Sequence, residues 1–149
     1  MKKKRIMIVE DEIVSARSLE MSLVKLGYDV TAIISSGEQA IQMLEKEECP
    51  ELVLMDISLQ GEMDGIETAR IINTKFYIPV IYLTSYAENK IFEKAKSTNP
   101  YGYLTKPFKK DELQKVVELG LYRHSFDEDR RMLVTELRKE IVERNRMER

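Results

Sequence analysis

An unbroken apolar run that ends on a carboxylate most constrains how this chain can fold. Leu52 to Met55 are all apolar, and Asp56 follows them directly. Strands of a parallel sheet that is covered on both faces are continuous apolar runs of this kind. The run is therefore predicted to be a central strand, with Asp56 at the carboxyl end where ligands bind in open α/β sheets. Taken alone, Asp56 is equally well explained as an ordinary loop aspartate.

Four further short apolar runs alternate with helical patterns along the chain. The helical segments carry apolar residues every three or four positions, which is the spacing of one helix face. The predicted strands are residues 6–9, 28–34, 52–55, 79–83 and 101–104, and the predicted helices pass through Leu19, Leu44, Ile66, Phe92 and Val117. This alternation predicts right-handed crossovers and one parallel sheet with helices on both faces, while the strand order stays open.

Polar residues follow four of the predicted strands. Glu10 and Asp11 end the first, Asp56 the third, Thr84 the fourth and Lys106 the fifth. Because the βα turns of such a sheet lie along one edge, these side chains are expected to gather around one crevice. Clustered carboxylates repel one another unless a cation joins them, and Mg²⁺ prefers such oxygen ligands. With an ammonium and a hydroxyl beside them, the pattern predicts phosphoryl transfer with Asp56 as the nucleophile.

Composition and charge exclude several other classes of protein. The formal net charge of -2 over 149 residues gives no bulk attraction for nucleic acid. The single cysteine, Cys49, excludes an internal disulfide and lies in no metal-ligand spacing. The basic residues 2–5 precede only four apolar residues, far fewer than the roughly 20 that a membrane span needs. We therefore expect a cytoplasmic protein that binds neither nucleic acid nor membrane.

The strand-end residues belong to a set of short motifs. These are Ile8 to Glu12, Met55-Asp56, Met63 to Gly65, Thr84-Ser85 and Tyr103 to Phe108. Through them the chain resembles the receiver domain of two-component response regulators, the chemotaxis-regulator-like family. The resemblance implies a flavodoxin-like, doubly wound sheet of five strands with five helices. It covers residues 1–124 as a receiver domain and leaves residues 125–149 as a charged helical extension or linker.

The resemblance also implies a role for each site residue. Asp56 would accept phosphate from a histidine kinase or phosphotransfer protein. Mg²⁺ would be held by Asp11, Asp56 and the main-chain carbonyl of Ser58, with Glu10 acting mostly through metal-bound water. The protein would not be an enzyme beyond catalysing its own phosphorylation and dephosphorylation.

The same resemblance implies a conformational switch next to the acyl phosphate. Lys106 would contact the phosphoryl group, and Thr84 would move its hydroxyl toward it. Tyr103 would then turn inward as the aromatic switch residue. The family also holds the bond before Pro107 in the cis form, which is rare enough to need tertiary enforcement.

The sequence departs from the commonest family pattern in three places. Glu10 replaces an aspartate, which lengthens the reach to the metal but keeps the charge. The connection 58–62 is one residue longer than usual and lacks a proline, so the loop over the metal is expected to be shaped differently. Ser58 and Tyr86, two residues after Asp56 and Thr84, match positions that tune access of water to the acyl phosphate in the family, and Tyr86 is bulky enough to shield it.

The last 25 residues are mostly charged. Leu133, Val134, Leu137 and Ile141 recur at helical spacing, but they cover less than two heptads, too few to predict a coiled coil. Either this helix packs on the domain or a symmetry mate, or the chain is the front of a longer protein, which we favour. Glutamates interleave with its basic residues and argue against DNA binding. His124 is interpreted as a surface histidine.

Several functions stay open beside the phosphoacceptor. The receiver could regulate a following domain, or lie at the front of a larger sensor kinase or multi-domain regulator. Homodimers through the fourth helix, fifth strand and fifth helix, or through the C-terminal helix, are both options. A haloacid-dehalogenase-like phosphohydrolase needs Asp-x-Asp after the first strand, where this chain has Glu10-Asp11-Glu12. A module that interacts without phosphorylation is the remaining alternative.

Overall fold

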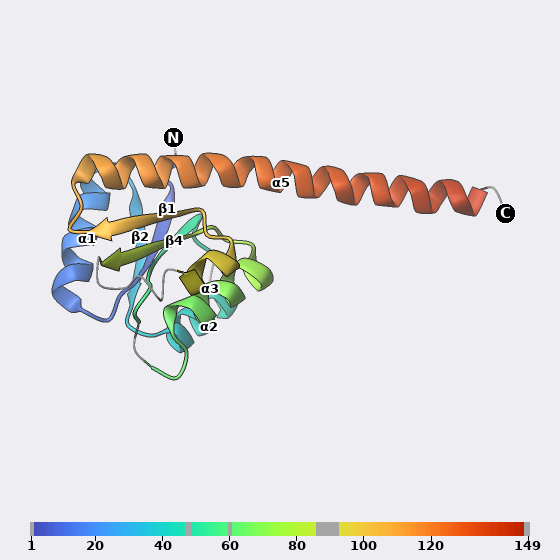
Figure 1. The fold of residues 1–149 in the computed structure, drawn as a ribbon. Coiled ribbons are helices and arrows are strands. Elements are labelled where there is room, and N and C mark those ends of the chain that lie inside the picture. Colours follow the sequence, from blue (N-terminus) through green and yellow to red (C-terminus); the bar gives the residue numbers. More distant parts are fainter. Residues whose placement is uncertain (1, 47–48, 60, 86–92, 148–149) are drawn as a thin grey trace.

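Five parallel strands form one sheet in the described part of the chain (Figure 1). The computed structural model describes residues 2–46, 49–59, 61–85 and 93–147. The strand order is β2-β1-β3-β4-β5, which the sequence left open. The predicted flavodoxin-like α/β fold is confirmed. The strand bounds are β1 (Arg5–Val9), β2 (Asp29–Ile34), β3 (Leu52–Asp56), β4 (Val80–Ser85) and β5 (Gly102–Lys106).

The helices follow the strands along the chain. They are α1 (Ile13–Lys25), α2 (Gly37–Lys46), α3 (Gly65–Ile71) with its π-helical continuation η1 (Ile72–Phe76), the 3-10 turn η2 (Lys96–Thr98) and α5 (Lys110–Met147). Most of the predicted fourth helix, including Ile91 and Phe92, lies outside the described residues. Its last described turn, residues 93–95, is helical.

Side-chain caps and a glycine set several helix ends. The Ser36 hydroxyl accepts a hydrogen bond from the Gln39 amide at 3.2 Å, as expected of an N-cap. The Asp64 carboxylate accepts one from the Glu67 amide at 2.8 Å at the start of α3. Gly27 follows α1 with φ of 95°, a conformation that glycine adopts without steric cost. These local signals place the helices between the strands.

Alternate residues of each central strand pack on opposite faces of the sheet. On β3, Leu52 and Leu54 join the core beneath α1 and α5, whereas Val53 and Met55 join the core beneath α2 and α3. All five β3 residues are buried, which confirms that β3 is a central strand. Figure 1 shows α1 and α5 on one side of the sheet and α2 and α3 on the other.

The last helix is one continuous rod of 38 residues. Its first part packs on the sheet through Leu113, Val117 and Gly120, and a side chain at Gly120 would meet Ile81 at 3.0 Å. The helix then leaves the domain and projects away from it (Figure 1). It does not break at residue 124, so the domain boundary drawn there stays a prediction. Among the described helices, none is both long and apolar enough to cross a membrane.

Candidate functional site

Three carboxylates meet where β1 and β3 end. Glu10 follows β1, Asp56 is the last residue of β3, and these strands pair directly in the sheet. One carboxylate oxygen from each of Glu10, Asp11 and Asp56 lies within 4.8 Å of the others. The sequence prediction that these acids gather at one edge is therefore confirmed in geometry. Hard oxygen donors in such a cluster have the chemistry that suits Mg²⁺.

The acids differ in how far they reach into solvent. Glu10 and Asp56 are only 3% and 6% exposed, whereas Asp11 lies at the surface. Burial raises the pKa of Glu10, and the hydrogen bond from Lys106 opposes this rise. A buried carboxylate is costly unless a cation or donor compensates it. The cluster therefore combines two buried acids with one at its open side.

Lys106 compensates part of this charge. Its ammonium lies 2.7 Å from Glu10 Oε2 across the crevice. Burial acts to lower the pKa of Lys106, but the hydrogen bond to Glu10 and the charge of Asp56 outweigh it, so the pKa is raised. Lys106 is thus charged and held beside the acids, at the end of β5 as predicted. In this structure its partner is Glu10.

Ser58 orients the Asp56 carboxylate. Both its main-chain amide and its hydroxyl donate to Asp56 Oδ1, at 3.0 and 3.1 Å. The sequence assigned the carbonyl of Ser58 to the metal and its position to the control of water access, and both roles stay predictions. The two donors were missed because a serine two residues after a strand gives no sequence signal of where it points.

Thr84 lies on β4 and Tyr103 on the neighbouring β5, and Thr84 is nearer to the carboxyl end of the sheet. Thr84 is buried near the end of β4, where its hydroxyl donates to the Ser85 carbonyl at 3.3 Å. Tyr103 is the second residue of β5, with its ring centroid 6.0 Å from that of Tyr82. Its hydroxyl oxygen is buried. The Lys106–Pro107 bond is cis, and Tyr86 lies outside the described residues.

Comparison with known proteins decides between the classes that this site allows. A family model described as the response regulator receiver domain matches residues 6–118, which carry all five strands and the acidic cluster. The chain belongs to this family. Receiver domains are signalling modules of two-component systems rather than classical enzymes, so the phosphohydrolase interpretation is set aside.

Similar proteins carry the receiver domain in chains of different kinds. The chain is 31% identical over 120 residues to the transcriptional regulatory protein PdtaR of Mycobacterium tuberculosis, a match that covers 80% of this chain and 58% of that protein. The signal receiver domain of a modulated diguanylate cyclase from Desulfovibrio desulfuricans G20 is 34% identical, with a TM-score of 0.79. That match covers 85% of this chain and 99% of the other.

A second similar structure was solved with a metal. It is the receiver domain of the sensor histidine kinase PA1611 from Pseudomonas aeruginosa PAO1, with a magnesium ion coordinated in its active site cleft. It is 32% identical, with a TM-score of 0.71, and covers 80% of this chain and 98% of that one. The chain spans about three fifths of the length of PdtaR, so the activity of any longer protein is not fixed by these matches.

Two further residues, one at the start of α3 and one on α2, shape the receiver site. A Cβ atom on Gly65 would lie 2.2 Å from the Asp56 carbonyl oxygen, so only glycine lets α3 begin this close to β3. Glu38 of α2 accepts a hydrogen bond from the Met63 amide at 2.8 Å and ties the long connection to its neighbour. The motif containing Gly65 was noted in the sequence, but its steric reason and the Glu38 contact were not.

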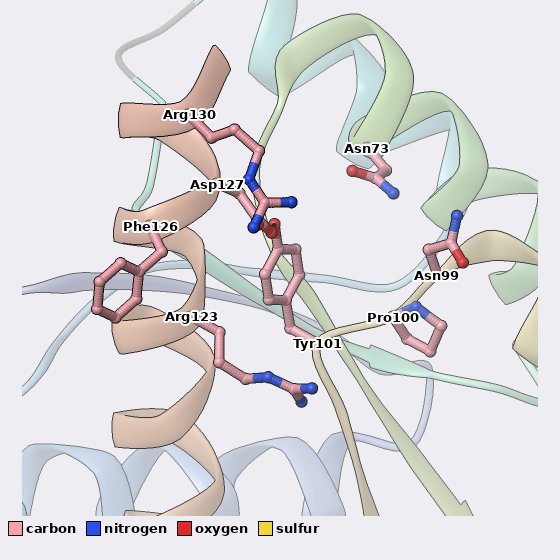
Figure 2. A pocket seen from close by; sticks show the side chains of 8 residues that line it. All are labelled: Asn73, Asn99, Pro100, Tyr101, Arg123, Phe126, Asp127 and Arg130. Carbon is pink, nitrogen blue, oxygen red and sulfur yellow. Dashed lines mark hydrogen bonds between the residues drawn. The ribbon is translucent and has the colours of Figure 1, made fainter. Parts of the chain in front are cut away.

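A pocket of about 510 Å³ lies at the opposite end of the receiver domain, near the start of β5. Figure 2 shows Tyr101 between Asn99 on one side and Asp127 of α5 on the other. The Tyr101 hydroxyl donates to Asp127, and burial together with this bond raises the pKa of Tyr101. This pocket lies far from the acidic cluster along the strands and was not predicted.

The residues beside this pocket fasten the middle of α5 to the domain. His124 Nε2 lies 2.8 Å from the Tyr77 main-chain oxygen, and the Arg131 guanidinium lies 3.7 Å from the centre of the Tyr77 ring. Together with the Tyr101–Asp127 bond, these contacts form what we call the α5 clamp. His124 was predicted to be a surface residue, and it is partly buried in this clamp.

Proposed function

We propose that this receiver domain accepts a phosphoryl group on Asp56 from a phosphohistidine of a partner histidine kinase or phosphotransfer protein. The observation that carries the proposal is the cluster of Glu10, Asp11 and Asp56 within 4.8 Å, with the Lys106 ammonium at the same edge. An Asp56 carboxylate oxygen attacks phosphorus, an acyl phosphate bond forms, and the bond to the histidine nitrogen breaks with its electron pair going to the imidazole.

The chain's own residues prepare the nucleophile for this step. The Ser58 amide and hydroxyl fix the plane of the Asp56 carboxylate through Oδ1, which reduces the freedom lost on reaching the transition state. Lys106 is close enough to the acids to exchange Glu10 for an incoming phosphoryl oxygen. Glu10, Asp11, Asp56 and the Ser58 carbonyl would hold Mg²⁺, which when bound supplies positive charge against the developing phosphoryl charge.

The proposed output is a change of the surface at the β5 edge of the sheet. Thr84 turns its hydroxyl toward the phosphoryl group, and Tyr103 follows it, which alters the face formed by the fourth helix, β5 and α5. A local charge change that biases a two-state element is the general physics of such switches. Since phosphoryl donors of this kind draw on ATP, we place the protein in the cytoplasm.

The proposal is tested by labelling the full chain with a small phosphodonor and Mg²⁺. We expect an acid-stable, base-labile adduct in the wild type and in Asp129→Asn, an exposed aspartate on α5 that serves as the matched control. Asp56→Asn should form no adduct. An adduct that persists in Asp56→Asn would place the acceptor elsewhere, and no adduct in any variant would favour a module that interacts without phosphorylation.

A further inference from the structure

A row of exposed apolar side chains runs along α5 from the domain into the projecting part of the helix. We call it the α5 stripe. Each of its members is between 49% and 62% exposed, although all are large and apolar. They are Leu119, Tyr122, Phe126, Leu133, Leu137 and Ile141. Contiguous exposed apolar surface of this kind marks an interaction site more often than scattered single residues do.

The α5 stripe faces away from the residues that pack on the domain's own core. At about 100° per residue, Leu119, Phe126 and Leu137 fall in one narrow sector, roughly a third to a half of a turn from Leu113 and Val117. Figure 1 shows the second half of α5 projecting clear of the sheet and the other helices. Within the described parts of the chain, nothing covers the α5 stripe from Leu133 onward, where every side chain is exposed.

The spacing of the α5 stripe follows an 11-residue repeat. Its steps are three, four and four residues from Leu119 to Arg130, and the same again from Arg130 to Ile141, so that the charged Arg130 interrupts the apolar stripe at one position of the repeat. Such a repeat has about 3.67 residues per turn and keeps a stripe on one face of an almost straight helix. The stripe spans slightly more than three heptads, the length at which helices pair. The sequence missed it because α5 was divided at residue 124.

We propose that α5 pairs in parallel with α5 of a second copy of this chain along the α5 stripe. A second copy of the chain complements the charges on the two flanks of the stripe. Asp129, Glu136 and Glu140 lie on one flank, and Arg123, Arg130 and Arg138 lie on or beside the other. Asp127 also lies on the basic side, where it accepts the hydrogen bond from Tyr101.

This asymmetry favours one orientation of the pair. In a parallel symmetric pair, the acidic flank of each helix faces the basic flank of its partner, whereas an antiparallel pair brings like charges together. The domain does not obstruct the pairing, since Leu119 and Tyr122 stay exposed where α5 packs on the sheet. Self-association does not depend on phosphorylation of Asp56, so its failure would leave the proposed function untouched.

The oligomeric state of the full chain tests the pairing. Sedimentation equilibrium at micromolar concentrations should give twice the chain mass. Leu137→Glu with Ile141→Glu should weaken the dimer at least about 100-fold, because each pair would then bury unpaired carboxylates. Met132→Glu with Val142→Glu, at exposed apolar positions of α5 off the stripe, is the matched control and should stay dimeric. A monomeric or trimeric wild type, or equal loss in both variants, would overturn the proposal.

A cysteine placed on the α5 stripe tests the orientation. In a Cys49→Ser background, Arg144→Cys puts the same thiol next to its own copy in a parallel pair, and mild oxidation should link the two chains. Lys139→Cys, on the opposite side of α5, should not crosslink. A dimer by mass that fails to crosslink through residue 144 would refute the parallel arrangement.

Discussion

At the scale of single residues, the site places three carboxylates beside one ammonium, which compensates only part of their negative charge. Lys106 bonds to Glu10, at an edge of the sheet that also holds the carboxylates of Asp11 and Asp56. Like charges this close raise the free energy of the folded state. A divalent cation should therefore stabilise the folded protein, and the open side of the cluster, at Asp11, is where it would enter.

Magnesium is expected to raise the free energy of unfolding. The gain should reach about 2.7 kcal/mol when the metal concentration is 100 times its dissociation constant. Asp11→Asn should lose most of this gain while folding normally, because Asp11 lies at the surface. Urea unfolding with and without Mg²⁺ measures both. Asp29→Asn, an exposed aspartate at the start of β2, is the control, and an equal magnesium effect in all three proteins would contradict the metal site.

Gly65 is a residue where one methyl group should disturb both fold and function. Gly65→Ala would place Cβ against the Asp56 carbonyl oxygen, so α3 must shift, at a cost of about 1–3 kcal/mol. The rate of Asp56 phosphorylation should fall as well, because Asp56 moves with its backbone. Gly102→Ala is the control, since its Cβ would have ordinary contacts of 3.6 Å or more. Equal stability of the two variants would refute the steric role.

At the scale of elements, the sequence could predict which residues end the strands. It could not predict which distant residues these side chains contact. Continuous apolar runs give β1, β3 and β4, and the common edge of a parallel sheet then places Glu10, Asp56 and Thr84 together without coordinates. The Lys106–Glu10 bond joins residues 96 positions apart and depends on the strand order, which periodicity does not encode. The α5 clamp is of the same kind, since His124 meets a carbonyl 47 residues away.

The start of the β1–β3 pair offers a stability test that depends on pH. Arg5 donates to the Glu51 carboxylate through its amide and guanidinium. Burial acts to raise the pKa of Glu51, but these bonds outweigh it and lower the pKa. Because the folded pKa lies below the ordinary value of 4.5, the stabilisation is fully present above pH 4.5 and is lost as pH falls through the folded value.

Glu51→Gln should therefore be less stable than the wild type at neutral pH, by about 0.5 kcal/mol for so exposed a pair. The difference should shrink as pH falls below 4.5. Chemical unfolding at a series of pH values measures it. Glu62→Gln, at an exposed glutamate before α3, should match the wild type throughout, and a difference for Glu51→Gln that grows on acidification would show that the sign is wrong.

At the scale of the whole molecule, α5 joins the two ends of the receiver domain. It begins four residues after Lys106, beside the acids, and reaches the α5 clamp near the amino ends of the strands. Sequence reasoning recognised the receiver up to residue 124 but treated residues 125–149 as an appendage. The clamp residues Asp127 and Arg131 lie beyond that predicted boundary and contact Tyr101 and Tyr77 of the receiver domain.

Loosening the α5 clamp should release the helix from the domain without unfolding it. Tyr101→Phe removes the bond to Asp127 and should lower the free energy of unfolding by about 1 kcal/mol. Hydrogen exchange at residues 124–131 should become faster, while residues 113–120 keep their protection through their buried contacts. Tyr122→Phe, an exposed tyrosine on the same helix, is the control. Unchanged exchange in Tyr101→Phe would show that the clamp does not hold α5.

The unbroken course of α5 has a mechanical consequence. From Arg131 to Met147 the helix extends about 24 Å beyond its last clamp contact. Such a rod is a lever arm whose fulcrum is the clamp, so a tilt of about 10° at the domain would carry its far end sideways by about 4 Å. A displacement at the start of α5, beside the acids, is thus carried to the tip at a similar size and in the opposite direction, with no need for the rod itself to bend.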